Sequence, residues 1–174
     1  MHRVVAVVTA VALVGCAHGL GSGRGARSWR SPSGTQLLEQ VEAPKGSAPP
    51  HWLVLKGTSS EDWLWRYEFF ATVEVLWSPD GSAFAINDHL TPEATALTVV
   101  DARDPERVYL INDLVEALPS ETDHFAKNDH AYVEAVGWTG DRELEVRGSG
   151  KGANDPDGFE RHYVYTVGGS LRVK

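Results

Sequence analysis

The chain has 174 residues, enough for one ordinary domain and too few for two. Apolar residues make up 42% and charged residues 23%, with 17 Gly and 9 Pro, a composition that fits a turn-rich globular protein better than a disordered chain or a helical bundle. The formal net charge of −8 argues against nucleic acid as a partner, because phosphates are bound by basic surfaces.

The N-terminal segment is typical of an export signal. A short basic head at residues 1–3 precedes residues 4–14, which carry no charge and are too few for a spanning helix of roughly 20 residues. Residues 13–16 (LVGC) then resemble the lipobox of bacterial lipoproteins. That resemblance implies cleavage before Cys16 and a lipid anchor on it, and Cys16 is the only cysteine of the chain.

Three regions follow from this interpretation. Residues 1–15 are the signal peptide, residues 16–28 the lipidated cysteine with a Gly-rich basic tether, and residues 29–174 a single β domain. Loss of residues 1–15 removes Arg3 and leaves 15 basic against 24 acidic residues, a net charge of −9. Ala17 resembles the pattern that is sorted to the outer membrane, so we expect the periplasmic side of that membrane rather than the inner membrane.

A hairpin is predicted around the stretch VLWSPDGSAFAIND at residues 75–88. Apolar residues alternate up to Trp77, and residues 78–81 have the chemistry of a tight turn: Pro79 fixes φ, Asp80 accepts a local hydrogen bond, and Gly81 tolerates positive φ. Phe84 then begins the second strand. We expect Trp77 to cover the end of the hairpin and seal the core.

This pattern recurs twice. In the first copy Trp29, Pro32 and Gly34 occupy the corresponding positions, and in the third copy only Trp138 and Asp141 do. The middle copy resembles the W-S-P-D-G hairpin of TolB-like β-propellers and related WD-type repeats. That resemblance implies a repeat of antiparallel meanders over most of residues 29–173, with these residues in structural roles.

The length limits how many units fit. A closed propeller needs about four blades of roughly 40 residues, whereas the domain has room for about three. We therefore expect an all-β fold, an incomplete propeller-like stack or a sandwich, whose exposed edges are covered by a helix, by charges or by another subunit. The predicted strands are 36–42, 52–56, 64–70, 72–77, 83–87, 96–101, 107–110, 132–138, 143–147, 160–167 and 171–173, with one helical insertion capped by Asn112 and running through Leu118.

Aromatic residues alternate along residues 63–69. Period two places Trp63, Trp65, Tyr67 and Phe69 on one face of a strand. Such a stripe packs as core against a neighbouring sheet, or forms a stacking platform for sugar rings, or buries itself in a partner interface.

The tripeptide Asn-Asp-His occurs at residues 87–89 and again at residues 128–130. Asp88, His89, Asp129 and His130 include ligand types that zinc accepts, and a histidine oriented by an aspartate can act as a base. Turn and cap roles explain the same residues, and the spacing does not distinguish these alternatives.

No strong catalytic signature is present, and we expect no cofactor. The leading hypothesis is a non-catalytic binding or scaffolding module of the bacterial envelope, with another envelope protein or a small ligand as its partner. The alternatives are a small metal-dependent or glycan-processing hydrolase that uses the Asn-Asp-His segments, and a carbohydrate-binding domain.

Overall fold

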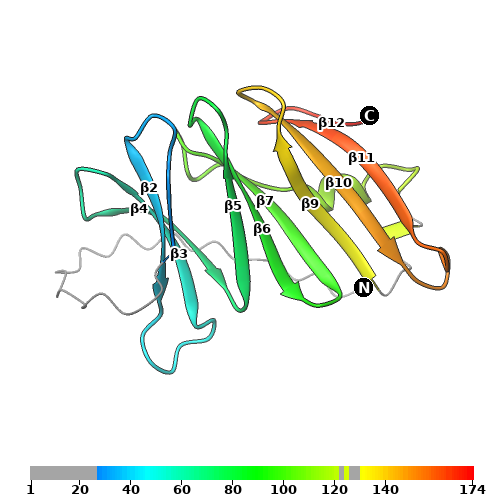
Figure 1. Cartoon of the computed structure of the whole chain (residues 1–174), viewed down its shortest axis with the longest axis horizontal. Helices are drawn as coiled ribbons and strands as arrows, with labels where there is room; N and C mark the ends of the chain where they lie inside the picture. Colours follow the sequence, from blue (N-terminus) through cyan, green and yellow to red (C-terminus); the bar gives the residue numbers. More distant parts are fainter. Residues whose placement is uncertain (1–26, 122–123, 126–129) are drawn as a thin grey trace.

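Strands make up most of the structure (Figure 1). The computed structural model describes residues 27–121, 124–125 and 130–174. Cys16, the predicted signal peptide, most of the tether and Asp129 lie outside these ranges. No helix in the described ranges is long and apolar enough to cross a membrane.

The strands form three consecutive antiparallel meanders of four strands each, as the all-β repeat predicts. The first comprises β1 (Ser28–Arg30), β2 (Gln36–Glu42), β3 (His51–Gly57) and β4 (Trp63–Phe69). The second comprises β5 (Thr72–Trp77), β6 (Ala83–Thr91), β7 (Ala94–Asp101) and β8 (Val108–Leu110). The third comprises β9 (His130–Trp138), β10 (Glu143–Lys151), β11 (Phe159–Thr166) and β12 (Leu171–Val173), and α1 (Ile111–Glu116) lies between β8 and β9.

The meanders lie side by side in chain order (Figure 1). The first is a separate four-stranded sheet, whereas a short parallel pairing of β7 with β9, at Ala94 with Ala131 and Thr95 with Tyr132, joins the second and third into an eight-stranded sheet. The result is an incomplete, propeller-like stack.

Two hydrophobic cores lie between the three meanders. The first core lies between the first and second meanders, and the second core lies between the second and third. Strand β6 contributes to both, because Phe84 and Ile86 point toward the first meander while Ala83 and Ala85 point toward the third. Residues 83–88 are therefore buried without interruption. Ile111 of α1 also enters the second core, so the helical insertion fills space between the second and third meanders.

The first two hairpin turns have the same hydrogen bonds. Gly34 N–H donates to the Ser31 carbonyl at 2.8 Å, and Gly81 N–H donates to the Ser78 carbonyl at 2.9 Å. Each serine hydroxyl accepts the N–H of the residue that opens the next strand, at 3.0 Å in both copies. Gly34 and Gly81 adopt φ of 73° and 71°, a conformation that glycine tolerates best.

The tryptophans at these turns connect successive meanders. The indole N–H of Trp77 donates to the backbone carbonyl of Trp29 at 3.2 Å, and that of Trp138 donates to the carbonyl of Leu76 at 3.0 Å. Each ring therefore binds the first strand of the preceding meander, in addition to covering the end of its own hairpin. The third turn is shorter, with Thr139 N–H donating to the Glu143 carbonyl at 2.9 Å.

Several boundaries differ from the sequence predictions. Strand β1 was not predicted, because its residues fall at the end of the predicted tether and directly before the first hairpin turn. Strands β6 and β10 each extend four residues further than predicted. Helix α1 begins after Leu110, without a side-chain cap, and ends at Glu116. Asn112 does not cap it: its side-chain amide accepts from Leu97 N–H at 2.8 Å and donates to the Thr95 carbonyl at 3.2 Å, which fixes the insertion to β7.

Candidate functional site

The aromatic residues of β4 do not share one face. A β-bulge at Leu55/Lys56 pairs Lys56 with Trp63 but Leu55 with Trp65, so the strand gains one residue and Trp63 turns to the opposite side. Phe69 is buried, and Trp65 and Tyr67 pack against the first core. The prediction that Trp63, Trp65, Tyr67 and Phe69 line one face is therefore wrong for Trp63, because alternation holds only while no residue is inserted.

Trp63 instead lies on the outer face of the first meander, where half of it is exposed (50%). Its ring meets that of Trp52, on β3, edge to face, with 5.8 Å between centroids. The Arg66 guanidinium lies over the Trp52 ring, 4.5 Å from its centroid. This arrangement holds the two indoles in place, since a cation above one ring and an edge contact with the other both restrict rotation.

Charged groups surround the two rings. The Lys56 ammonium, opposite Trp63, lies 2.8 Å from a carboxylate oxygen of Glu39 and 3.5 Å from one of Glu61. The hydrogen bond with Glu39 is the main cause that raises the pKa of Lys56, so the amine stays charged. We call Trp52, Trp63, Arg66, Lys56 and the two glutamates the ring surface.

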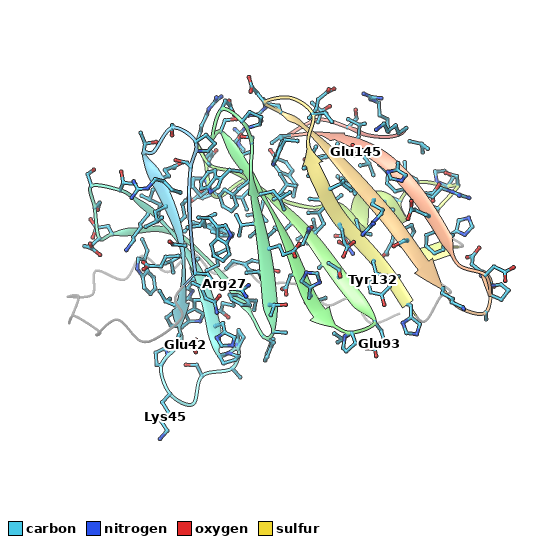
Figure 2. All side chains as sticks on the ribbon, viewed as in Figure 1. Arg27, Glu42, Lys45, Glu93, Tyr132 and Glu145 are labelled. Atoms are coloured by element: carbon cyan, nitrogen blue, oxygen red, sulfur yellow. The ribbon has the colours of Figure 1, made fainter. Side chains whose placement is uncertain are left out.

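The outer face of the third meander has a different character. There β9 and β10 carry ion pairs, with Arg147 2.6 Å from Glu134 and with Glu145 2.6 Å from Lys174, the residue after β12. Glu145, labelled in Figure 2, belongs to β10 of this meander and is partly exposed. The two ends of one stack therefore differ: one is a solvated ladder of charges, and the other exposes a large indole.

The first Asn-Asp-His segment connects the meanders. The Asn87 side chain, facing the third meander, donates to the Ala135 carbonyl at 3.1 Å and accepts from Ala135 N–H at 2.8 Å. Asp88 points the other way and accepts the hydroxyl of Tyr67 at 2.8 Å. Burial raises the pKa of Asp88, while Tyr67 and the nearby His89 act in the opposite direction. The pKa of Tyr67 is raised as well, mainly by burial.

The histidines take other partners. His89 Nδ1 lies 3.5 Å from the hydroxyl of Thr95, and His130, exposed at the start of β9, lies 3.4 Å from that of Tyr132. Asp129 is outside the described residues, and within the described part of the chain no three His, Cys, Asp or Glu side chains gather as a metal site. The predicted set of Asp88, His89, Asp129 and His130 thus gains no geometric support.

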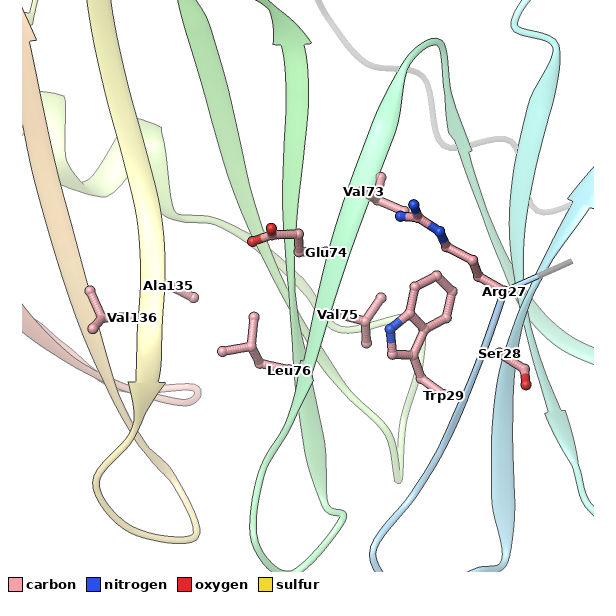
Figure 3. Close-up of a pocket in the computed structure, with 9 residues that line it drawn as sticks. All are labelled: Arg27, Ser28, Trp29, Val73, Glu74, Val75, Leu76, Ala135 and Val136. Carbon is pink, nitrogen blue, oxygen red and sulfur yellow. The ribbon is translucent and has the colours of Figure 1, made fainter. Parts of the chain in front are cut away.

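An open groove of about 570 Å³ runs along the first strands of the three meanders (Figure 3). Trp29 of β1, Val73 and Leu76 of β5 and Ala135 of β9 contribute apolar surface, and Val136 is half exposed (51%). Its charged members are Arg27, which directly precedes β1, and Glu74 of β5. We call it the inner groove.

A second hollow of about 520 Å³ lies at the turn end of the stack. Residues of the first two hairpin turns meet there with the loop that follows β7. We call it the turn-end pocket. It contains the ion pair of Asp80 with Arg103, at 3.0 Å.

Sequence reasoning missed Trp52, Lys56, Arg66 and Arg103 as candidates. Each stands alone in a strand or loop, and only the register of β3 with β4, including its bulge, brings the first three together. The repeated Ser-Pro-x-Gly turns were the available signal for the turn-end pocket, since Asp80 belongs to one of them.

No protein-family model and no curated protein matches this sequence. Among solved structures, the chain is similar to a fucose lectin from Kordia zhangzhouensis, in complex with methyl-fucoside. The two are 14% identical, the match covers 86% of this chain and 97% of that chain, and the TM-score is 0.36. A likeness of this size establishes neither a family nor a ligand.

Proposed function

We propose that this chain is a non-catalytic carbohydrate-binding module, exported and held at the cell envelope through Cys16. One observation carries the binding function: Trp63 is half exposed on the outer face of the first meander, in edge contact with Trp52 and opposite an ion-paired lysine. The main core of that meander lies on its other face, and on the outer face the side chain of Val54, between Trp52 and Lys56 in the alternation of β3, is fully buried.

The chemistry of the ring surface suits a sugar. An indole offers a flat apolar area against which the C–H face of a pyranose can lie, and burying an aromatic side chain contributes about 1.5–3 kcal/mol. Lys56 donates hydrogen bonds, and Glu39 and Glu61 accept them, so both the hydrogen and the oxygen of a sugar hydroxyl find partners. The pre-existing ion pairs orient these groups before a ligand arrives.

The environment of the buried Asp88 carboxylate also agrees with a binding role rather than a catalytic one. Asp88 is enclosed in the first core, and the Tyr67 hydroxyl engages it. A catalytic acid or base needs access to substrate, whereas this carboxylate ties β6 to β4. The geometry around Asp88 therefore favours a structural role.

Saccharide binding can be measured with the Cys16→Ser chain, which needs no detergent. We expect it to bind at least one class of envelope or neutral oligosaccharide on a glycan array, and Trp63→Ala to weaken that binding about tenfold or more, since a stacked ring is removed. Phe70→Ala, which removes a more exposed aromatic (63%) just beyond β4, is the matched control and leaves affinity unchanged. Absence of binding to every saccharide, or equal affinity of both variants, contradicts the proposal.

The envelope anchor is tested separately. In cells fed labelled palmitate, the wild-type chain is expected to incorporate label and to sediment with membranes. Cys16→Ser is expected to lose the label and to appear in the soluble fraction. A wild-type chain that remains unlabelled contradicts the anchor without affecting the sugar site.

The inner groove favours a second candidate function, docking of an extended segment of another envelope protein. Strands β1 and β5 are edge strands of their sheets and flank this groove, and edges accept added strands. A photo-crosslinking residue at Val136 is expected to capture a partner, whereas the same residue at Val173, equally exposed (51%) on β12, is not. Capture at neither position, or at both alike, contradicts docking in the groove.

A further inference from the structure

The turn-end pocket lies where two copies of the same turn come together. It is lined by Ser33, Thr35 and Gln36 of the first hairpin and by residues 80–82 of the second. The two turns are in contact, because a Cβ placed on Gly81 would lie 3.5 Å from Pro32. The pocket therefore lies where the two turns pack together.

Its central polar group is the pair of Asp80 and Arg103. One Asp80 oxygen accepts the Ser78 hydroxyl at 2.8 Å and Ser82 N–H at 2.9 Å, and the other accepts Arg103 at 3.0 Å. Burial opposes ionisation of this carboxyl, but these hydrogen bonds and the arginine together lower the pKa of Asp80. The carboxylate stays charged and fixed in orientation, and the guanidinium keeps further N–H groups for a ligand, because it has five.

Hydroxyl and amide groups complete the polar lining. The Ser82 hydroxyl is buried, has no hydrogen-bond partner within 3.5 Å among the described residues, and lies close enough to Asp80 to help lower the pKa of that carboxyl. The hydroxyls of Ser33 and Thr35 form a hydrogen bond of 2.8 Å, and the side-chain amide of Gln36 donates to the Ala102 carbonyl at 2.9 Å.

The pocket also has an apolar side. Leu64, the residue inserted by the bulge in β4, reaches it and is half exposed (53%), and Pro105 lies in the same wall. This lining matches a molecule with both C–H and O–H surfaces, because it combines an apolar side with several hydroxyls and with a carboxylate beside a guanidinium. Because Asp80 and Arg103 balance, the lining has no net charge to attract an anion.

We propose that the turn-end pocket binds a small neutral polyhydroxylated molecule, of the size of a monosaccharide or a cyclic polyol. Arg103 donates to ligand oxygens, and Asp80 and Gln36 orient ligand hydroxyls. The site is separate from the ring surface and does not depend on sugar binding there.

The experiment is a titration of the isotope-labelled Cys16→Ser chain, followed by backbone amide NMR. The probes are glucose, galactose, mannose, fucose, xylose, N-acetylglucosamine and myo-inositol, with acetate and sulfate as anions. At least one neutral probe is expected to shift the amide signals of Gly81, Ser82 and Arg103. Arg103→Met, which keeps much of the side chain's length without its donors, is expected to weaken that binding about tenfold or more.

Two further variants separate binding from folding. Arg107→Met alters an equally exposed arginine of the same loop, paired with Asp104 outside the pocket, and is expected to leave affinity unchanged. Ser82→Ala is expected to weaken binding by less than Arg103→Met does, and its melting temperature measures how much this hydroxyl stabilises the free protein. Shifts with anions alone, shifts confined to the ring surface, equal losses in the two arginine variants, or no shifts at millimolar probe overturn the proposal.

Discussion

Gly34 and Gly81 hold the left-handed backbone that closes the first two hairpins. A side chain in this conformation costs about 1–2 kcal/mol. Gly34→Ala and Gly81→Ala should each lower the free energy of unfolding by about 1 kcal/mol or slightly more, measured by urea denaturation. For Gly34→Ala the loss of stability comes from backbone conformation alone, because no neighbouring atom lies within 4 Å of the added Cβ.

The third turn supplies the control for this prediction. Gly140 also has open space where an added Cβ would lie, but it is not among the glycines with positive φ. Gly140→Ala should therefore be neutral or slightly stabilising. An equal loss in all three variants would contradict a specific requirement of the first two turns.

Asp88 gives stability a dependence on pH. Its folded-state pKa lies above the ordinary 3.8, chiefly through burial, so the folded state favours the protonated carboxyl. The stabilising contribution is complete below the unfolded pKa and is lost as pH rises through the folded pKa. Asp88→Asn, which still accepts the Tyr67 hydroxyl, should gain stability relative to the wild type as pH rises from about 4 to about 7.

Urea unfolding of the two chains across that pH range measures the difference. Tyr67→Phe is a useful companion, because it removes the donor and leaves Asp88 buried without it, at a cost of about 2 kcal/mol at neutral pH. The same change should cost less in the Asp88→Asn background. A stability difference between wild type and Asp88→Asn that does not vary with pH would contradict the role assigned to this carboxyl.

At the scale of elements, the side chain of Asn87 connects β6 to β9, two strands that do not pair with each other. Asn87→Ala leaves the N–H and the carbonyl of Ala135 without their partners, and each such buried group costs about 1–3 kcal/mol. We expect the free energy of unfolding to fall by about 2–4 kcal/mol. Glu74→Ala, at the exposed position that pairs with Asn87 across β5 and β6, is the control and should change stability by less than about 0.5 kcal/mol.

Local pattern was sufficient to predict most strands and the repeated hairpin. Alternation of apolar residues and the Ser-Pro-Asp-Gly turn predicted both ends of β5 and the first residue of β6 correctly. The two signals lie within a few positions of each other, so each limits the other. The same pattern failed at Trp63, where a bulge inserts one residue, and at Asn112, whose backbone partners are 15 and 17 residues away.

The candidate sites were less accessible to sequence reasoning. The turn-end pocket takes residues from segments near positions 34, 64, 81 and 103, and nothing local in any of them indicates the others. The ring surface depends on the register of β3 with β4. Register and meander packing are set by long-range burial, which a single sequence does not display.

At the scale of the whole molecule, the stack ends in a polar face at its third meander. Terminal repeats of stacked proteins need such faces, because an apolar end would add further units. Arg147 with Glu134 and Lys174 with Glu145 supply this cover, and each exposed pair contributes little to stability by itself. We expect these charges to keep this face of the stack from packing against a second copy of the chain.

Replacement of this cover should therefore produce self-association without unfolding. We expect the lipid-free wild-type chain to be monomeric in sedimentation velocity, and the double variant Glu134→Val with Arg147→Leu to associate as concentration rises. Asp104→Val with Arg107→Leu removes an exposed carboxylate–arginine pair from a loop, and it should remain monomeric. If the wild type itself associates, or if the two double variants behave alike, the charges of β9 and β10 do not terminate the stack.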